Sequence, residues 1–380
     1  MSTPAQQTQW ILGQPSYTLA SNLVHVHITA TAGHLAPAWF RHGNRTLAPL
    51  SIAPWWPEQH PDLPPILRIL RGDFFCLPFG GGSLNGESHP IHGDTANLPW
   101  NALSSTSRDG VHELTLAMQT TTRPGRVEKL IRLIDHHLAI YQQHTIQGMA
   151  GPMPLGHHVM LQFPPDASAH ISTSPTRGAQ VWLEPGEIPA LRGYSALKPG
   201  AIFDDLTRVP TADGSTTDLS RYPARDGFED LVLLPTADGI QLAFSAAVVP
   251  SAGYIWLNLR STRHLASTLL WHSNGGRHYA PWNGRHRGVL GLEDLTSYFA
   301  AGLAPSITDN HLNRAGIPTA VNLSTSTPTV IRYASLCIPC PEHFTHVHRV
   351  EPDDAGSSIT IIDTAGQTTT AQADIAWLLG

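Results

Sequence analysis

The chain has 380 residues, of which 41% are hydrophobic and 14% are charged, and this is ample for a large buried core. Its net charge is −6 and it has no basic stripe, which argues against nucleic acid as a partner. No apolar run approaches the ~20 residues of a membrane-spanning helix, and no secretory signal is visible at the N-terminus. We therefore expect a cytoplasmic protein without a membrane partner.

Glycine, proline and cysteine usage favours a turn-rich chain without a disulfide framework. Gly and Pro number 32 each, which suits many short strands joined by turns. Of the three cysteines, Cys76 lies in an apolar run and is expected in the core. Cys337 and Cys340 form a lone CxxC motif, which without a second pair is weak evidence for zinc or redox chemistry. No metal and no cofactor is predicted.

Apolar and polar residues alternate with a period of two along most of the chain, and this pattern predicts β-strands. The predicted strands cover residues 23–28, 111–119, 127–134, 138–145, 231–234, 240–249, 254–260, 267–271, 289–292, 330–338 and 358–362. Asp-Gly and Asn-Gly turn signals separate many of them, and helices are expected only at residues 295–303 and 371–379. The pattern predicts an all-β, mainly antiparallel fold, a sandwich of large sheets with few short helices.

The chain shows no convincing linker and no internal repeat, so one domain is expected over residues 1–380. Residues 208–226 are polar and rich in Thr, Asp and Gly, but strands of the same style are predicted on both sides. We predict a surface loop there, with a domain boundary as the alternative.

Two motifs in the first quarter of the chain carry candidate ligand-binding side chains. Arg71 stands in an Arg-Gly-Asp segment that leads into Cys-Leu-Pro-Phe-Gly. Its rigid fork of donors can bind sugar hydroxyls, and the alternative is an ion pair with Asp73. His92 is followed by a glycine and could project into a cleft, with a structural role as the alternative.

Adjacent histidines, His157 and His158, open a later apolar run. Neighbours on a strand point to opposite faces, so we expect only one of the two in a cleft. The same geometry disfavours chelation of one metal ion by both rings.

Glu293 follows an apolar run at residues 289–292. A carboxylate after a buried strand is costly unless it is paired or functional, and a capping or ion-pair role is the alternative. The next residue, Asp294, is expected to cap the helix predicted at 295–303.

Taken in chain order, these motifs resemble the aldose 1-epimerase (galactose mutarotase-like) superfamily. The Arg-Gly and Pro-Phe-Gly stretch is similar to that of the hexose-6-phosphate epimerase branch, and His92-Gly with Trp100 is similar to the family's His-Gly…Trp. The segment Gly-His-His-Val-Met-Leu is similar to the family strand Gly-x-His-Pro-Tyr-Phe, and Gly-Leu-Glu at 291–293 to the strand that ends in the catalytic Glu. The resemblance implies a β-supersandwich fold and a mechanism without cofactors.

The resemblance also implies catalytic roles. Glu293 matches the general base that takes the proton of the anomeric hydroxyl, and His158 matches the general acid that protonates the ring oxygen, with His157 as a rival. Ring opening, rotation of the carbonyl and closure would then interconvert the anomers. Such a mechanism is chemically sufficient, because one positioned acid and one positioned base can catalyse the reaction, and neither a metal nor a hydride is needed.

Sugar-binding roles follow from the same resemblance. Arg71, His92 and His157 are candidates to hold the sugar, and Asp230, with Glu229 as a rival, matches a family Asp that contacts hydroxyls. The implied ligand is a monosaccharide or sugar derivative, and the implied protein a monomer or homodimer.

The segments after the two catalytic candidates depart from the family pattern. Val-Met-Leu replaces Pro-Tyr-Phe after His158, and Asp-Leu-Thr replaces a Pro-rich continuation after Glu293. Two alternatives therefore stay open. One is a carbohydrate-binding protein without turnover, and the other is a lyase or hydrolase that would use Tyr298 or Asp294 as a further group.

Overall fold

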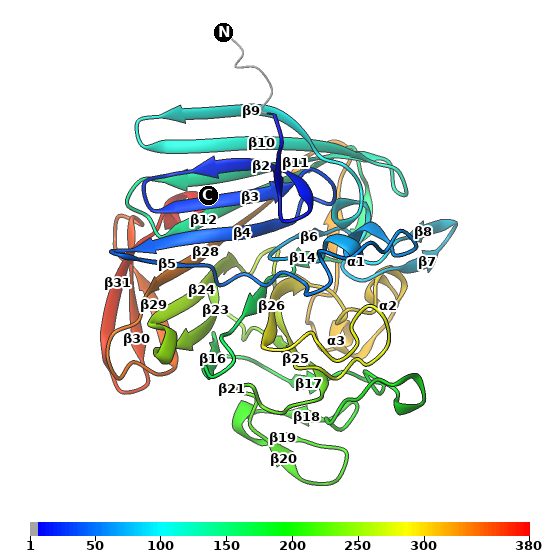
Figure 1. Ribbon diagram of the computed structural model, residues 1–380. Helices are drawn as coiled ribbons and strands as arrows, with labels where there is room; N and C mark the ends of the chain where they lie inside the picture. Colours follow the sequence, from blue (N-terminus) through cyan, green and yellow to red (C-terminus); the bar gives the residue numbers. More distant parts are fainter. Residues whose placement is uncertain (1–6) are drawn as a thin grey trace.

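The computed structural model describes residues 7–380, which form large antiparallel sheets with few short helices (Figure 1). The predicted all-β, mainly antiparallel fold is confirmed. Across the nine-stranded sheet the strands are β21 (Arg221–Tyr222), β16 (Ala169–Thr173), β23 (Leu242–Val249), β24 (Tyr254–Ser261), β28 (Thr329–Pro339), β12 (Ala139–Gln147), β11 (Gly125–Ile134), β10 (Val111–Thr120) and β9 (Asn101–Arg108).

A second large sheet has eight strands and carries most of the candidate residues. Its strands are β18 (Ile202–Phe203), β17 (Ala179–Val181), β22 (Glu229–Pro235), β25 (Ser267–Ser273), β26 (Val289–Thr296), β14 (Leu155–His157) and β6 (Phe75–Cys76), with β15 (Met160–Gln162) also paired to β26.

The remaining strands form smaller sheets. The five-stranded sheet contains β1 (Gln9–Ile11), β2 (Gln14–Ala20), β3 (Val24–Thr29), β4 (Leu35–His42) and β5 (Arg45–Leu47), and the three-stranded sheet β29 (Val347–Pro352), β30 (Ser358–Asp363) and β31 (Thr368–Gln372). Three two-stranded sheets pair β7 (Gly82–Leu84) with β8 (Glu87–His89), β13 (Gly151–Met153) with β27 (Val321–Leu323), and β19 (Val209–Pro210) with β20 (Thr216–Thr217). The α-helices are α1 (Pro65–Ile69), α2 (Leu303–Ile307), α3 (His311–Arg314) and α4 (Ile375–Leu379).

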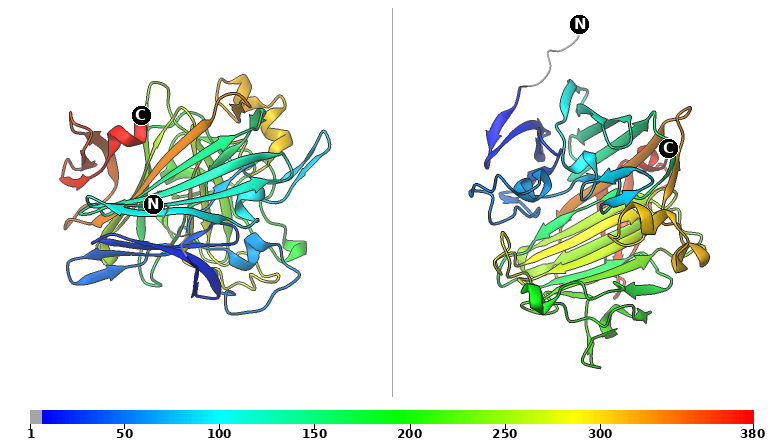
Figure 2. Two further views of the ribbon diagram at one scale, coloured as in Figure 1. Left: turned by 90° about the horizontal axis from the view of Figure 1, so that it is seen from above. Right: turned by 90° about the vertical axis from the view of Figure 1, so that its right-hand side faces the viewer.

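The main core lies on one face of the nine-stranded sheet, where the five-stranded and eight-stranded sheets pack against it. Figure 2 shows the N-terminal blue strands running along one side of the cyan strands of this sheet. The opposite face is covered by the three-stranded sheet and α4. Successive side chains of β24 point to opposite faces of the sheet. Trp256 points into the main core, while Ile255 and Leu257 pack toward the C-terminal sheet.

Both predicted helices need correction. Residues 295–303 do not form a helix, because Leu295 belongs to β26 and pairs there with Gly156 of β14 and Ser267 of β25. The helix α2 begins only at Leu303. Sheet pairing here overrides local helical preference. In the segment 371–379, β31 continues to Gln372 and only the last residues form α4.

The segment 208–226, expected as a surface loop, contains β19, β20 and β21. β21 pairs with β16 at the edge of the nine-stranded sheet, and Tyr222 is buried in the main core. No helix within residues 7–380 is long and apolar enough to cross a membrane.

Candidate functional site

A cavity of about 450 Å³ opens on the face of the eight-stranded sheet that points away from the main core. Leu231 of β22, Leu269 and Trp271 of β25 and Glu293 of β26 lie side by side on this face, because Leu231 pairs with Trp271 and Leu269 with Glu293. The other lining residues are Ile66, Leu67, Leu70, Phe74, Gly80, Gly81, Ile91, His92, His158, Arg277, Tyr279, Trp282 and Ala300. The sheet therefore supplies one side of the cavity, and α1 and several loops supply the rest.

Glu293 and His158 meet in this cavity. Nε2 of His158 lies 3.4 Å from Oε1 of Glu293, and the side chains are 8% and 2% exposed. Burial, together with the nearby Asp294, raises the pKa of Glu293 well above its ordinary value, and burial lowers the pKa of His158 well below its own. The buried pair therefore favours a state with one proton, held by the carboxyl group, and no net charge.

Aromatic rings fix the position of His158. The ring of Phe74 stacks on its imidazole at 4.5 Å between centroids, and His92 approaches it edge-on at 4.9 Å. His92 is held in turn by the backbone N–H of Gly80, which donates to its Nδ1 over 3.3 Å. Burial lowers the pKa of His92 to about 4, so its ring is neutral at neutral pH.

Period-two alternation separates Glu293 from its neighbour. Asp294 points into the main core, where it forms an ion pair with Nη1 of Arg260 at 3.1 Å. Thr268 and Tyr333 each donate a hydrogen bond of 2.7 Å to the same carboxylate. The expected helix-capping role of Asp294 is therefore wrong, because this residue lies within β26.

The two adjacent histidines also point to opposite faces. His157 lies in the main core, with Nδ1 2.9 Å from Oδ2 of Asp73 and its ring stacked on Tyr333 at 4.1 Å. His158 is the one that lines the cavity. The structure thus brings together Glu293, His158 and His92, and leaves His157 outside the cavity.

Arg71 and Asp230 do not line the cavity either. Arg71 is fully buried and donates to the backbone oxygens of Ile69 and Leu12. Asp230 accepts hydrogen bonds from the backbone N–H groups of Ala196 and Leu197. Both side chains thereby hold neighbouring chain segments in place.

Glu229 lies directly behind the cavity lining. Its carboxylate accepts hydrogen bonds from Nε1 of Trp271 at 2.9 Å and from the backbone N–H of Gly276 at 3.0 Å. Burial raises the pKa of Glu229 to about 7. This group therefore titrates near neutral pH while it supports an indole of the cavity wall.

Sequence reasoning missed a cationic and aromatic group on one side of the cavity. The Arg277 guanidinium lies 4.5 Å from the ring centroid of Trp282 and 5.1 Å from that of Trp271. Its Nε contacts Oε1 of Glu187 at 2.5 Å, and the hydroxyl of Tyr279 donates to the other oxygen of Glu187 at 3.2 Å. The available signal was the Asn-Gly-Gly turn at residues 274–276, directly before Arg277.

Comparison of the sequence with family models and with curated proteins finds no match. Solved structures do match in three dimensions. A galactose mutarotase-like protein from Clostridium acetobutylicum has a TM-score of 0.55 at 12% identity, over 88% of this chain and 98% of that one. A galactose mutarotase related enzyme from Lactobacillus acidophilus has a TM-score of 0.54 at 12% identity, over 86% and 98%.

A protein from Synechocystis sp. PCC 6803 is similar to the same extent, with a TM-score of 0.57 at 12% identity over 89% of this chain and 100% of that one. The chain has the galactose mutarotase-like fold. At this level of identity the likeness concerns the fold, and function has to be argued from the cavity itself.

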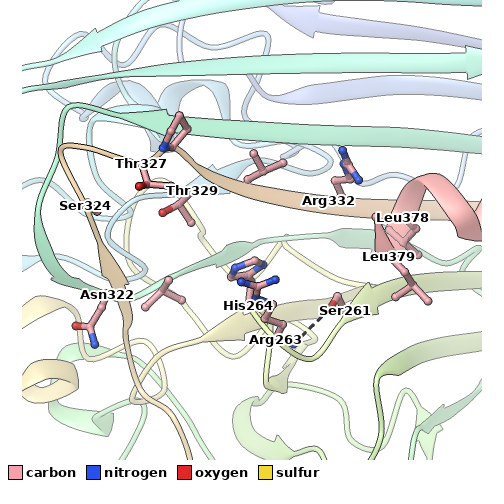
Figure 3. Close-up of a pocket in the computed structure, with 14 residues that line it drawn as sticks. Ser261, Arg263, His264, Asn322, Ser324, Thr327, Thr329, Arg332, Leu378 and Leu379 are labelled. Carbon is pink, nitrogen blue, oxygen red and sulfur yellow. Dashed lines mark hydrogen bonds between the residues drawn. The ribbon is translucent and has the colours of Figure 1, made fainter.

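A second cavity, of about 420 Å³, lies elsewhere in the galactose mutarotase-like fold, between the turn after β24, strands β27 and β28, and α4 (Figure 3). Its lining includes Arg263, His264 and Arg332 but contains no carboxylate side chain. The guanidinium of Arg332 is already engaged with Gln143 and with the backbone oxygen of Trp377. This cavity lacks the carboxyl–imidazole pair of the first one.

Within residues 7–380, no group of three or more His, Cys, Asp or Glu side chains is arranged to hold a metal ion.

Proposed function

We propose that this protein is an aldose 1-epimerase-like isomerase that interconverts the anomers of a sugar bound in the Glu293 cavity. The observation that carries the proposal is the isolation of the Glu293 carboxyl group. It is 2% exposed, yet within residues 7–380 its only polar contact is the 3.4 Å approach to His158. A carboxyl group that is buried and so poorly satisfied is available to a ligand.

The pair supplies the acid and the base that mutarotation requires. The proton held by Glu293 crosses to Nε2 of His158 when the hydroxyl groups of a bound sugar stabilise the carboxylate. Glu293 then takes the proton of the anomeric hydroxyl while the imidazolium protonates the ring oxygen, and the bond between the anomeric carbon and the ring oxygen breaks. The products are the open-chain aldehyde, a protonated Glu293 and a neutral His158.

This product state matches the protonation that burial favours in the pair. Rotation about the bond next to the carbonyl carbon exposes its other face, and reversal of the proton transfers closes the opposite anomer. We assign the binding of sugar oxygens to His92 and Arg277, which line the cavity, in place of Arg71, which does not. Trp271 offers an apolar ring on which a sugar face can stack.

The test is the rate of anomer exchange, measured by NMR magnetisation transfer on D-glucose and D-galactose. We expect Glu293→Gln to lower the enzyme-catalysed rate by roughly 10²–10⁴-fold, because it removes the base and keeps the shape. Glu342→Gln is the matched control, since that side chain is 89% exposed. Equal rates for wild type and Glu293→Gln would refute the assignment, and sugar binding without exchange would make the protein a carbohydrate-binding module.

A further inference from the structure

The cavity that holds Glu293 is apolar over most of its lining. Its polar side chains are His92, His158, Arg277, Tyr279 and Glu293. The other side chains are aliphatic or aromatic, and they include three from α1 and the segment just after it, namely Ile66, Leu67 and Leu70. A sugar that carries a hydroxyl group at every ring position would place some of them against groups that cannot form hydrogen bonds.

The apolar lining continues to the surface. Ile91 lines the cavity and is 53% exposed. Outside the lining, the backbone of Gly193 forms a β-bridge with Arg277, and the same segment exposes Ile188 at 49% and Leu191 at 65%. The exposed aliphatic side chain of Ile91 in the lining favours a ligand with an apolar part.

The charges in the lining do not favour a phosphorylated ligand. Arg277 is the one lysine or arginine among the lining residues of the described chain, and Glu187 already neutralises it at Nε. Glu229 contributes further negative potential at the same guanidinium. A phosphate dianion would need surplus positive charge, and this cavity offers none.

We propose that the ligand is a neutral aldose in which an apolar group, a deoxy position or a small ether or ester substituent, replaces one hydroxyl group away from the anomeric carbon. The proposal rests on the proposed function in one respect, since the anomeric hydroxyl must stay free to reach Glu293. Its own basis is the apolar lining formed by α1 and Ile91.

Discrimination follows from desolvation. A hydroxyl group pressed against Leu67 or Leu70 loses its hydrogen bonds to water and gains none, whereas a methyl or methylene group at that position gains contact area. One such replacement in an apolar pocket changes kcat/KM by about tenfold or more.

The experiment uses two matched series with D-gluco and D-galacto configuration. Each contains the parent hexose, its 2-deoxy, 6-deoxy and 3-O-methyl derivatives, and its 6-phosphate. Anomer exchange is measured by NMR for each sugar, and binding of the same sugars is measured by titration calorimetry. We expect at least one apolar derivative to exceed its parent about tenfold in kcat/KM, and the 6-phosphate not to exceed the parent.

The two readouts separate this proposal from the proposed function. If no sugar is turned over but an apolar derivative binds about tenfold more tightly than its parent, the ligand class stands and the catalytic assignment fails. If the parent or its phosphate is turned over fastest, the catalytic assignment stands and the ligand class is refuted. Absence of any preference in both readouts also refutes the ligand class.

Variants of α1 locate the preference. Leu67→Asn should lower the ratio of kcat/KM for the apolar derivative over its parent, because it adds hydrogen-bonding groups to the lining. Leu67→Met keeps the lining apolar and should keep the ratio, which separates polarity from misfolding. Leu103→Asn, at a leucine of β9 that is 46% exposed outside this lining, is the control and should leave the ratio unchanged. An unchanged ratio in Leu67→Asn would overturn the role given to α1.

Discussion

Glu229 gives the protein a stability that should fall as pH rises toward neutrality. The folded state raises the pKa of this carboxyl from 4.5 to about 7, with burial as the largest cause. The folded state holds the proton of Glu229 more tightly than the unfolded chain does. The contribution of this carboxyl group to the free energy of unfolding is therefore fully present below pH 4.5. It is lost as pH rises through 7, and the whole change amounts to roughly 3 kcal/mol.

Replacement of Glu229 by Gln removes the titrating group and keeps its size. The free energy of unfolding of wild type and variant would be measured by urea denaturation at pH steps from 4.5 to 8. We expect the difference in the free energy of unfolding to shift in favour of the variant by about 3 kcal/mol over this range. All other titrating groups are shared by the two proteins, so their contributions cancel in this difference. At pH 4.5 the variant should have the lower free energy of unfolding. Its amide N–H₂ is a donor and faces another donor, either the indole N–H of Trp271 or the backbone N–H of Gly276.

The control for this comparison is Glu342→Gln, at a side chain that is 89% exposed. Its difference from wild type should stay constant over the same pH steps. Parallel curves for wild type and Glu229→Gln would refute the reasoning, because they would mean that burial does not hold the proton on Glu229.

Two further predictions concern β26. A methyl group at Gly291 would clash with Oε1 of Glu293 and with Cβ of Trp271, which lines the cavity. Gly291→Ala should therefore lower anomer exchange by roughly 10²-fold while Glu293 itself is kept, and a melt by circular dichroism would verify the fold. An unchanged rate would argue against a carboxylate and an indole held in position for the reaction. Asp294→Asn leaves Arg260 without its buried partner and should cost about 3–5 kcal/mol in urea denaturation, and a loss below 1 kcal/mol would contradict the importance of this ion pair.

Period-two alternation made part of this site predictable. It placed His157 and His158 on opposite faces of a strand. In the structure His157 contacts Asp73 in the main core, and His158 lines the cavity on the other face. Alternation alone does not say which face holds a cavity, because both faces of the eight-stranded sheet are buried. Both histidines therefore remained candidates until the packing of the sheets was known.

Long-range placement was beyond the sequence. Arg71 binds backbone oxygens in the core, whereas Arg277 lines the cavity, and the sequence around neither arginine shows this difference. The difference depends on which distant segments meet, because Arg71 is bridged to Ile52 and Arg277 to Gly193. The helix predicted at 295–303 is absent for the same reason, because pairing with β14 and β25 continues β26 to Thr296.

Asp294, Glu229 and Glu293 are buried acidic side chains of β22 and β26 that differ in how fully they are satisfied. Asp294 has an arginine and several hydroxyl donors, and Glu229 has an indole N–H and a backbone N–H. Glu293 has only His158 within the described residues, at 3.4 Å. A carboxyl group kept for stability would gain from donors such as those its neighbours have, and an apolar residue would cost less at the same position. The poorly satisfied carboxyl of Glu293 is therefore best explained by a ligand whose hydroxyl group completes its hydrogen bonding.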